Sequence, residues 1–366
     1  RSYTFKQDWY DEMANRRPGS GKPEVEVDAN GNYLYYANTD WYNILFKNQA
    51  WGNEHNLSVQ GATDKNGFII SGRYYTQDGL YRYNSDDYSM YNLRAKGFAK
   101  IFDWLVVDNN TELSQMNYFY PHRVGDGSVW YGLEGDSNPM IPMFNPDGTL
   151  TMGAAFSAGD LWYGKNGITT KKRLLRNTTS FTSSFFNDVF RVKGDLTFRN
   201  ADGLEQVRRV PVPYSNKVGQ ISYIGTETND LGITNSNTNY LATNIYGEYE
   251  NTFGDAHYFK GMLGYNYEQS VFNSILTQRN GLIYPGADNL NLTTGSGIKV
   301  NSGYEKWRIA GGFFRLNYSF KDRYLVEING RYDGSTKFPV NQQWGFFPSI
   351  SAGWRISNES FWKVDY

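Results

Sequence analysis

The sequence predicts an all-β fold, and more specifically part of a transmembrane antiparallel β-barrel. Aromatic residues and glycine are abundant, with 30 Tyr, 23 Phe, 10 Trp and 38 Gly in 366 residues, a composition typical of strands and tight turns. Many segments alternate apolar and polar residues, which is the period of a strand. The connections between them alternate between short and long, as they do in outer-membrane barrels.

The composition also excludes several kinds of site. Lys and Arg total 36 and Asp and Glu total 37, so the net charge gives no reason to expect a nucleic-acid partner. The chain has no cysteine, which excludes disulfides, thiolate metal sites and cysteine nucleophiles. Its three histidines, His55, His122 and His257, lie far apart without ligand spacing. We therefore expect no metal, no cofactor, no catalytic residue and no enzymatic activity.

The first 50 residues differ from the rest of the chain. YTFKQDWYDEMANRR (3–17) is a candidate short helix. PEVEVDANGNYLYY (23–36) predicts a small hairpin with Asn30 and Gly31 in its turn, because Asn-Gly favours the positive φ values of a tight hairpin turn. We expect residues 1–50 to be a segment separate from the regular strands that follow.

From Trp51 onward the alternation becomes regular. We predict strands at 55–62, 68–76, 89–101, 105–116, 173–186, 190–200, 241–253, 258–270, 307–320, 323–335 and 346–358. The stretch FRVKGDLTFRN (190–200) shows the pattern without a break, since one face would be apolar and the other densely charged. A charged row of this density inside a closed soluble core would leave ions without water. We therefore expect the apolar face to meet lipid and the charged face to line a hydrated lumen.

The connections support this interpretation. TDKNG, FDW, NDV, GDAH and KD are short turns, whereas residues 77–88, 117–172, 201–240, 271–306 and 336–345 form long loops. All short turns would lie at one end of the strands and all long loops at the other, as in an outer-membrane barrel. Aromatic residues beside the short turns predict an interfacial girdle, made of Phe102, Trp104, Phe185, Phe186, Phe320, Tyr324, Phe361 and Trp362.

Eleven strands in an open sheet would expose two unpaired edges to hydrocarbon, which is costly. Bacterial single-chain barrels also have an even number of strands. We therefore expect the sequence to be a fragment, and the start RSYTFKQDWY, which lacks a signal-peptide pattern, agrees with a missing N-terminus.

Four stretches resemble the SusC/RagA-like TonB-dependent transporters of Bacteroidetes. The most specific is RYDGSTKFPVNQQWGFFPSISAGWRISNESF (331–361). The others are TDWYNILFKNQAWGNEHNLSVQGATDKNGF (39–68), YRYNSDDYSMYNLRA (81–95) and VRRVPVPYSNKVGQIS (207–222). They occur in the order and spacing of that family, so the resemblance covers nearly the whole chain.

The resemblance implies a 22-stranded barrel filled by an N-terminal plug, of which this chain would supply about half. Residues 1–50 would be an extracellular loop segment after the first barrel strand. Residues 51–366 would be the N-terminal half of the barrel, strands 2 to 12. The plug, the TonB-contacting segment and the remaining strands have no counterpart here.

The resemblance also implies a function and partners. A protein of this type sits in the bacterial outer membrane and imports oligosaccharides from glycan breakdown, with oligopeptides as the alternative cargo. A SusD-like lipoprotein would cap its extracellular side, and TonB would act on the missing plug. The sequence names neither the cargo nor the oligomeric state.

Transport requires ligand contacts, and aromatic planes beside polar groups suit sugar rings. The candidate ligand contacts in the long loops are Trp130, Tyr131, Trp162, Tyr163, Tyr223 and Tyr284. The charged residues expected to face the lumen or the plug are Arg191, Lys193, Arg199, Glu248, Glu327 and Arg331. A role of these rings in holding the loops together, or in contacting the lipoprotein, remains open.

Two other classes of function stay open at this point. A soluble or surface all-β glycan-binding protein would share the aromatic content and the alternation, but its apolar faces would pack on each other in two layers. A surface glycosidase would need two carboxylates about 5 to 10 Å apart across a cleft, and the sequence suggests no such pair.

Overall fold

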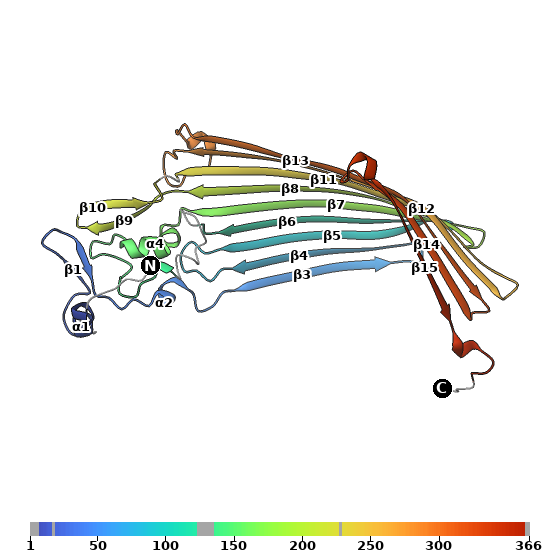
Figure 1. Cartoon of the computed structure of the whole chain (residues 1–366), viewed down its shortest axis with the longest axis horizontal. Coiled ribbons are helices and arrows are strands. Elements are labelled where there is room, and N and C mark those ends of the chain that lie inside the picture. The colour runs from blue at the N-terminus through green and yellow to red at the C-terminus, as the bar shows by residue number, and fades with distance from the viewer. Residues whose placement is uncertain (1–6, 17–18, 123–134, 227–228, 363–366) are drawn as a thin grey trace.

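A single antiparallel sheet of eleven strands makes up most of the protein (Figure 1). The computed structural model describes residues 7–16, 19–122, 135–226 and 229–362. The strands of the sheet, in chain order, are β3 (Gly52–Ala62), β4 (Asn66–Asp78), β5 (Asp87–Phe102), β6 (Leu105–Tyr120), β7 (Gly167–Phe185), β8 (Phe190–Arg209), β11 (Asp230–Phe253), β12 (His257–Asn280), β13 (Ile298–Phe320), β14 (Tyr324–Ser335) and β15 (Trp344–Trp354).

Each of the eleven predicted strands has an observed counterpart, although the last, predicted at 346–358, ends at Trp354 and is followed by a short 3-10 helix at Ile356–Asn358. Their order in the sheet is their order in the chain, from β3 at one edge to β15 at the other. The hairpin of β9 (Val212–Lys217) and β10 (Gln220–Ile224) intervenes between β8 and β11 but pairs only within itself. The sheet is therefore an up-and-down meander, the connectivity of an outer-membrane barrel wall.

Several strands are longer than predicted. β11 starts at Asp230 instead of residue 241, β12 ends at Asn280 instead of 270, and β13 starts at Ile298 instead of 307. These extensions pair in register, from Asp230↔Asn280 onward. The added part of β11 carries polar residues on both faces, as in TNSNTN (234–239). Where water meets both faces of a strand, apolar and polar residues need not alternate, so the two-residue period that predicts a strand is absent from the sequence.

The sorting of short and long connections is confirmed. The short turns lie together at the right of Figure 1, and most of the long connections lie at the left beside the helices. The connection between β14 and β15 does not reach that end, because these two strands are shorter than their neighbours. Left-handed backbone conformations tighten the turns, with φ of +56° at Gly254, +55° at Asp255, +49° at Lys321 and +53° at Asp322. Glycine, Asp and Asn tolerate this region best. The predicted long loops are shorter than expected, because the strands extend into them.

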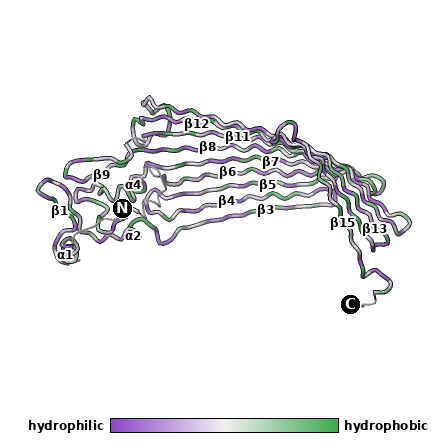
Figure 2. Tube along the Cα trace, viewed as in Figure 1, coloured by the Kyte–Doolittle hydropathy of each residue, from purple (hydrophilic) through white to green (hydrophobic). Residues whose placement is uncertain are grey.

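The sheet has two chemically different faces, and adjacent strands keep them in register. We call the side of Leu196 the apolar face; across β8 and β11 it continues through Phe198↔Leu241 and Gly194↔Ile245. We call the side of Lys193 the polar face. Figure 2 shows hydrophobic and hydrophilic residues interleaved along the strands, as this alternation requires.

Large apolar side chains of the sheet remain exposed. Leu57, Leu196, Leu263 and Ile350 are among them. No second layer of the described residues packs on the sheet, since each of its strands contacts mainly its neighbours in the sheet. The soluble two-layer alternative required the apolar faces to cover each other, and the described structure does not have that arrangement.

The main buried hydrophobic core lies in the connections. Residues 25–47, 79–86, 136–166 and 210–224, here called the loop module, pack around a shared core. Its helices and strands are α2 (Trp41–Leu45), α4 (Met152–Tyr163), the hairpin β1 (Val25–Val27) and β2 (Tyr33–Tyr35), and the β9–β10 hairpin. The predicted short helix is confirmed as α1 (Gln7–Asn15), and so is the β1–β2 hairpin with Gly31 at φ +84°.

Helix α4 was not predicted, because it lies within the expected long loop 117–172. Its start is capped by Thr151, whose hydroxyl accepts a hydrogen bond from the Ala154 amide at 3.1 Å, and it ends at Gly164 with φ +66°. Both are common helix boundaries. Ala154, Ala155 and Ala158 let the helix approach its neighbours closely, and Val212 of β9 packs in the same core.

Among the described residues, we find no helix with the length and apolar character needed to span a bilayer.

Candidate transport surface

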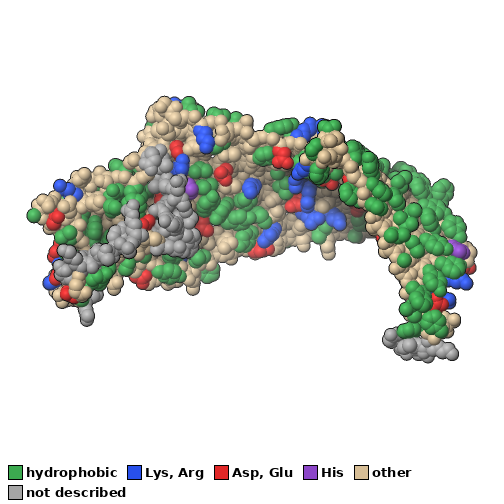
Figure 3. Space-filling view, in the orientation of Figure 1, with side chains coloured by type: hydrophobic (Ala, Val, Ile, Leu, Met, Phe, Trp, Pro, Cys, Tyr) green, Lys and Arg blue, Asp and Glu red, His purple; other side chains and the backbone are tan. Residues whose placement is uncertain are grey.

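The polar face of the sheet carries all six of the charged residues singled out in the sequence. Figure 3 shows charged side chains on the broad face turned to the viewer, and apolar side chains where the sheet curls away at the right. Register places Lys193 beside Tyr246, Arg191 beside Glu248, and Glu327 beside Asn317. Their side chains thus share one continuous surface across many strands, although whether it meets a lumen or a plug stays a prediction.

Near the short turns, the polar face holds a network of ion pairs. Lys193 Nζ lies 2.8 Å from a Glu248 oxygen, and Lys260 Nζ lies 3.0 Å from Glu250 Oε2. Arg191 pairs with both carboxylates and contacts Glu250 most closely. Five half-buried or buried charges thus bridge β8, β11 and β12. Glu250 and Lys260 were not singled out from the sequence, although alternation places both on this face.

Further along the polar face, cations lie over aromatic rings. The Arg199 guanidinium lies 5.0 Å from the Tyr240 ring centroid, and the Tyr240 hydroxyl donates to Glu268 Oε2 at 3.0 Å. On β14, Arg331 pairs with Asp333 at 2.9 Å and lies 5.2 Å from the Phe313 ring. Such contacts fix the charged groups in place.

A row of tyrosines lies on the polar face close to the loop module. Tyr75 and Tyr88 have ring centroids 5.8 Å apart, Tyr88 and Tyr118 are 6.0 Å apart, and Tyr118 and Tyr120 are 5.2 Å apart and stacked. They come from β4, β5 and β6. This row was not predicted from the sequence. The alternation within each strand places each tyrosine on the polar face, but only the register between strands shows that the rings are neighbours.

The loop candidates differ in their surroundings. Trp130 and Tyr131 lie outside the described residues. Trp162 packs edge-on against Tyr83 and Phe144, with centroids 4.8 Å apart in both cases. Tyr163 is half-buried and packs against the loop-module core. These two rings therefore help to hold the loop module together.

Tyr223 and Tyr284 are the candidates with the freest rings. Tyr223 lies on β10 and is 54% exposed, and Tyr284 lies between β12 and β13 and is 49% exposed. Tyr223 belongs to the loop module, and Tyr284 lies in a connection at the same end of the sheet. They remain candidate ligand contacts.

Exposed aromatic residues line the short-turn end, as the girdle prediction expects. Phe102 stacks on Trp104 with centroids 5.4 Å apart, and Trp104 stacks on Phe185 at 5.8 Å. At the other side of the sheet, Tyr324 stacks on Trp354 at 6.4 Å. Aromatic rings of this kind settle at the boundary between hydrocarbon and water.

The described residues contain no group of three or more His, Asp or Glu side chains arranged to hold a metal ion. His55 instead stacks near Tyr74, with centroids 6.4 Å apart, and His257 Nδ1 shares a 2.8 Å hydrogen bond with the Tyr318 hydroxyl.

Buried tyrosines make the loop module sensitive to alkaline pH. Burial raises the pKa of Tyr33, Tyr35 and Tyr81 to about 12, and Tyr33 also donates a 2.7 Å hydrogen bond to Asp147. An unfolded tyrosine ionises near 10. Because the folded pKa is raised, the stability from these groups is fully present below pH 10 and is lost as the pH rises towards about 12.

We therefore expect the loop module to lose protection from hydrogen exchange between about pH 10 and 12, while the sheet keeps it. The Tyr33→Phe variant should lose its protection from hydrogen exchange over a narrower pH interval, because it has one titrating tyrosine fewer. If the loop module stayed equally protected between pH 10 and 12, ionisation of these tyrosines would not destabilise it.

Comparisons with known proteins agree with this geometry. No family model matches the chain. The chain is 26% identical over 337 residues to the TonB-dependent receptor P26 of Formosa agariphila, covering 89% of this chain and 32% of the relative. It is 25% identical to the TonB-dependent receptor SusC of Bacteroides thetaiotaomicron, covering 89% of this chain and 33% of SusC. The chain thus spans about a third of the length of these curated relatives.

Solved structures show the same fold. The RagAB peptide importer in its closed-closed state superposes with a TM-score of 0.72 at 18% identity, covering 98% of this chain and 39% of the importer chain. The outer-membrane transporter YddB of Escherichia coli superposes with a TM-score of 0.52 at 9% identity, over 84% of this chain and 36% of YddB. With its meander and its two-faced sheet, the chain has the fold of part of an outer-membrane barrel, and its sequence is similar to those of SusC/RagA-type TonB-dependent receptors.

Proposed function

We propose that the chain forms part of the wall of an outer-membrane importer for oligomeric nutrients, driven through TonB. The observation that carries this proposal is the opposition of the two faces. The apolar face leaves leucine, isoleucine and phenylalanine side chains uncovered, which suits acyl chains. The polar face holds ion pairs and hydrogen-bonded side chains, which suit a hydrated passage or a plug.

We further propose that residues 1–50 belong to an extracellular loop and that residues 51–366 form consecutive strands of the N-terminal half of the barrel. The clustering of the long connections into the loop module supports this, because long loops of such barrels face the outside. The N-terminal segment packs with later connections in one core. It would therefore help to build the extracellular surface on which a SusD-like lipoprotein would sit.

The proposed cargo is an oligosaccharide. Tyr223 and Tyr284 offer exposed rings near the loop module, and the row of Tyr75, Tyr88 and Tyr118 continues along the polar face. Stacked rings suit the apolar faces of sugars, and neighbouring polar groups suit their hydroxyls. Oligopeptides are the second candidate, since the similar RagAB structure is that of a peptide importer.

The test is uptake by cells that carry or lack the gene, supplied with labelled oligosaccharide mixtures or labelled oligopeptide mixtures. We expect gene-dependent uptake of the oligosaccharides, abolished when TonB is removed. Uptake of peptides alone would favour the second candidate. No gene-dependent uptake of either, or uptake that persists without TonB, would contradict the proposal.

A variant pair tests the ligand contacts. We expect Tyr223→Ala combined with Tyr284→Ala to lower uptake at limiting cargo by about 10-fold, as expected when two stacking contacts of about 0.5–1.5 kcal/mol each are lost. Tyr304→Ala is the control, because Tyr304 is more exposed than either tyrosine but lies on the apolar face of β13. Equal uptake by the double variant and the control would remove both tyrosines from the cargo path.

A further inference from the structure

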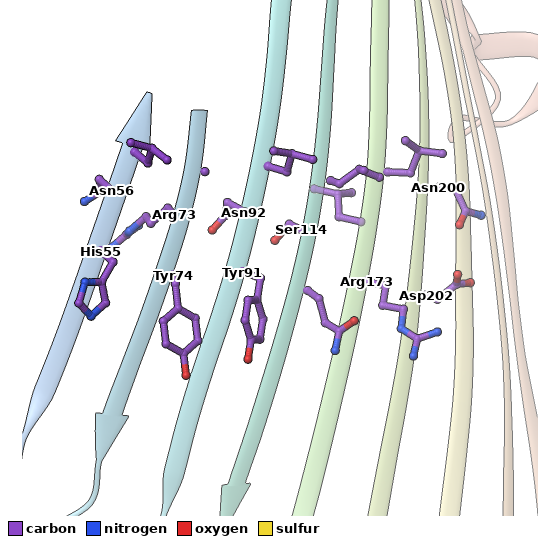
Figure 4. A pocket seen from close by; sticks show the side chains of 17 residues that line it. His55, Asn56, Arg73, Tyr74, Tyr91, Asn92, Ser114, Arg173, Asn200 and Asp202 are labelled. Carbon is purple, nitrogen blue, oxygen red and sulfur yellow. The ribbon is translucent and has the colours of Figure 1, made fainter. Parts of the chain in front are cut away.

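The apolar face carries a groove that runs across β3 to β8. Its volume is about 670 Å³. One rim consists of the leucines Leu57, Leu93, Leu113 and Leu175. The other rim, which Figure 4 shows as a row of side chains on successive strands, consists of His55, Tyr74, Tyr91, Gln115, Arg173 and Asp202. One side of the groove is therefore aliphatic, and the other is aromatic and polar.

A second hollow adjoins the first on the same face. It has a volume of about 540 Å³ and reaches from β7 to β12. The asparagines Asn235, Asn237 and Asn273 contribute to its lining. Arg173 and Asp202 line both hollows, and Lys171 lines the second. An amide-rich hollow and a leucine-rich groove therefore meet at two cationic side chains.

The charge at this junction is positive. Lys171 and Arg173 are exposed, and within the described ranges neither takes part in an ion pair. Asp202 is the one carboxylate among the residues lining the two hollows, and it accepts a 2.6 Å hydrogen bond from the Asn237 side chain. Two cationic side chains and one carboxylate leave a net positive charge, and the neighbouring amide groups can donate hydrogen bonds. This combination favours the binding of an anionic group.

The position along the strand fits the edge of a membrane. Arg173 and the aromatic Phe185 at the short-turn end both lie on β7. At ~3.3 Å per residue and a tilt of ~40°, about 30 Å separate them along the membrane normal. The apolar band of such a barrel is ~25 Å tall. Leu175 therefore lies near the upper edge of the hydrocarbon, and Arg173 and Lys171 lie just beyond it.

We propose that the two hollows form one binding site for a membrane lipid that bears an anionic phosphate headgroup. Its acyl chains lie along the leucine rim. Its phosphate contacts Lys171 and Arg173, and its headgroup takes hydrogen bonds from the asparagine amides. Tyr74 and Tyr91 lie against each other beside the boundary, with ring centroids 4.7 Å apart and the ring planes tilted by 31°, where aromatic rings prefer to lie. The proposal depends only on the apolar face meeting lipid and not on the identity of the cargo.

The test uses the detergent-purified protein and native mass spectrometry. The probes are phosphatidic acid and phosphatidylcholine with identical acyl chains. We expect the protein to retain phosphatidic acid at least five-fold more than phosphatidylcholine. The double variant Lys171→Gln/Arg173→Gln should lose this preference. Lys172→Gln is the matched control, because the next residue along β7 points to the polar face, and it should keep the preference.

Two further arms keep the outcome interpretable. The variant Lys171→Arg/Arg173→Lys retains both charges and should retain the preference, which shows that a loss in the double variant is not a folding defect. Inorganic phosphate at millimolar concentration should not displace the lipid, since it lacks the acyl contacts. Displacement of the lipid by phosphate would show a site for small anions and would contradict a lipid site. Equal retention of both lipids, or a preference for phosphatidic acid that survives in the double variant, would also overturn the proposal.

Discussion

Replacing Leu263 by arginine is expected to prevent most of the protein from folding stably in the membrane. Leu263 lies on the apolar face of β12 and is 71% exposed. It lies six residues from His257 at the start of the strand, which places it about 15 Å from the short turn, near mid-bilayer. An arginine facing lipid at that depth costs about 2–4 kcal/mol. Outer-membrane abundance of the heat-modifiable folded form, and urea titration in vesicles, would measure the loss.

The matched control is Met262→Arg, the same change at the preceding residue. Met262 lies on the polar face, between Glu248 and Arg315 in register. Both residues are apolar and adjacent, so the two variants differ mainly in which face receives the charge. We expect Met262→Arg to cost less than about 1 kcal/mol, because its guanidinium meets polar groups and water. If the two variants lost stability equally, the apolar face would not be the one that meets lipid.

The sheet could be predicted because its central parts separate two solvents. In β8, the residues Phe190 to Phe198 alternate strictly, since one side must suit lipid and the other must suit water. In the outer parts of β11 and β12, water reaches both faces, and the alternation disappears although the pairing continues from Asp230 to Phe253. The strand could be recognised in the sequence wherever the environment was asymmetric, and its full length could not.

The loop module could not be predicted for a different reason. Its core joins Trp41, Tyr81, Leu161 and Val212, which come from four connections far apart in the sequence. Each connection alone reads as an irregular loop, because none carries enough periodic apolar residues to define an element. Helix α4 (MGAAFSAGDLWY) carries apolar residues around most of its circumference, so it lacks the one-sided pattern of a surface helix. Only the meander, which brings the connections to the same end, creates their core.

The same limit applied to the candidate contacts. Trp162 and Tyr163 were singled out as aromatic residues in a loop that could contact ligand or hold the loops together; they pack within the loop module, and ligand contact stays a prediction. The charged residues were easier to place, because the alternation along each strand puts Lys193 and Glu248 on its charged face from the sequence alone. Residues whose position follows from strand alternation were predictable, and residues whose position follows from loop packing were not.

Truncating Leu161 to alanine is expected to open the loop module without disturbing the sheet. Leu161 is 1% exposed and belongs to the core that joins α4 to α2 and β9. Removing a buried leucine side chain costs about 2–5 kcal/mol, through lost burial and the cavity left behind. The sheet shares little of this core, so the loss should appear as local opening.

Hydrogen exchange of the folded protein in detergent would measure that opening. Amides of α4 (Met152–Tyr163) and β9 (Val212–Lys217) should exchange about 30-fold to 5000-fold faster in Leu161→Ala, which is the rate change equivalent to about 2–5 kcal/mol. The exchange rates of the amides of β7 and β8 should not change.

Met152→Ala is the control in the same helix, since Met152 is 37% exposed and its truncation should change the free energy of unfolding by less than about 0.5 kcal/mol. Faster exchange throughout β7 and β8 would show that the loop module and the sheet unfold as one unit. Unchanged exchange in α4 would show that Leu161 does not stabilise the module. The predicted result requires that the loop module can open separately from the sheet, because its hydrophobic core is formed by the connections and not by the strands of the sheet.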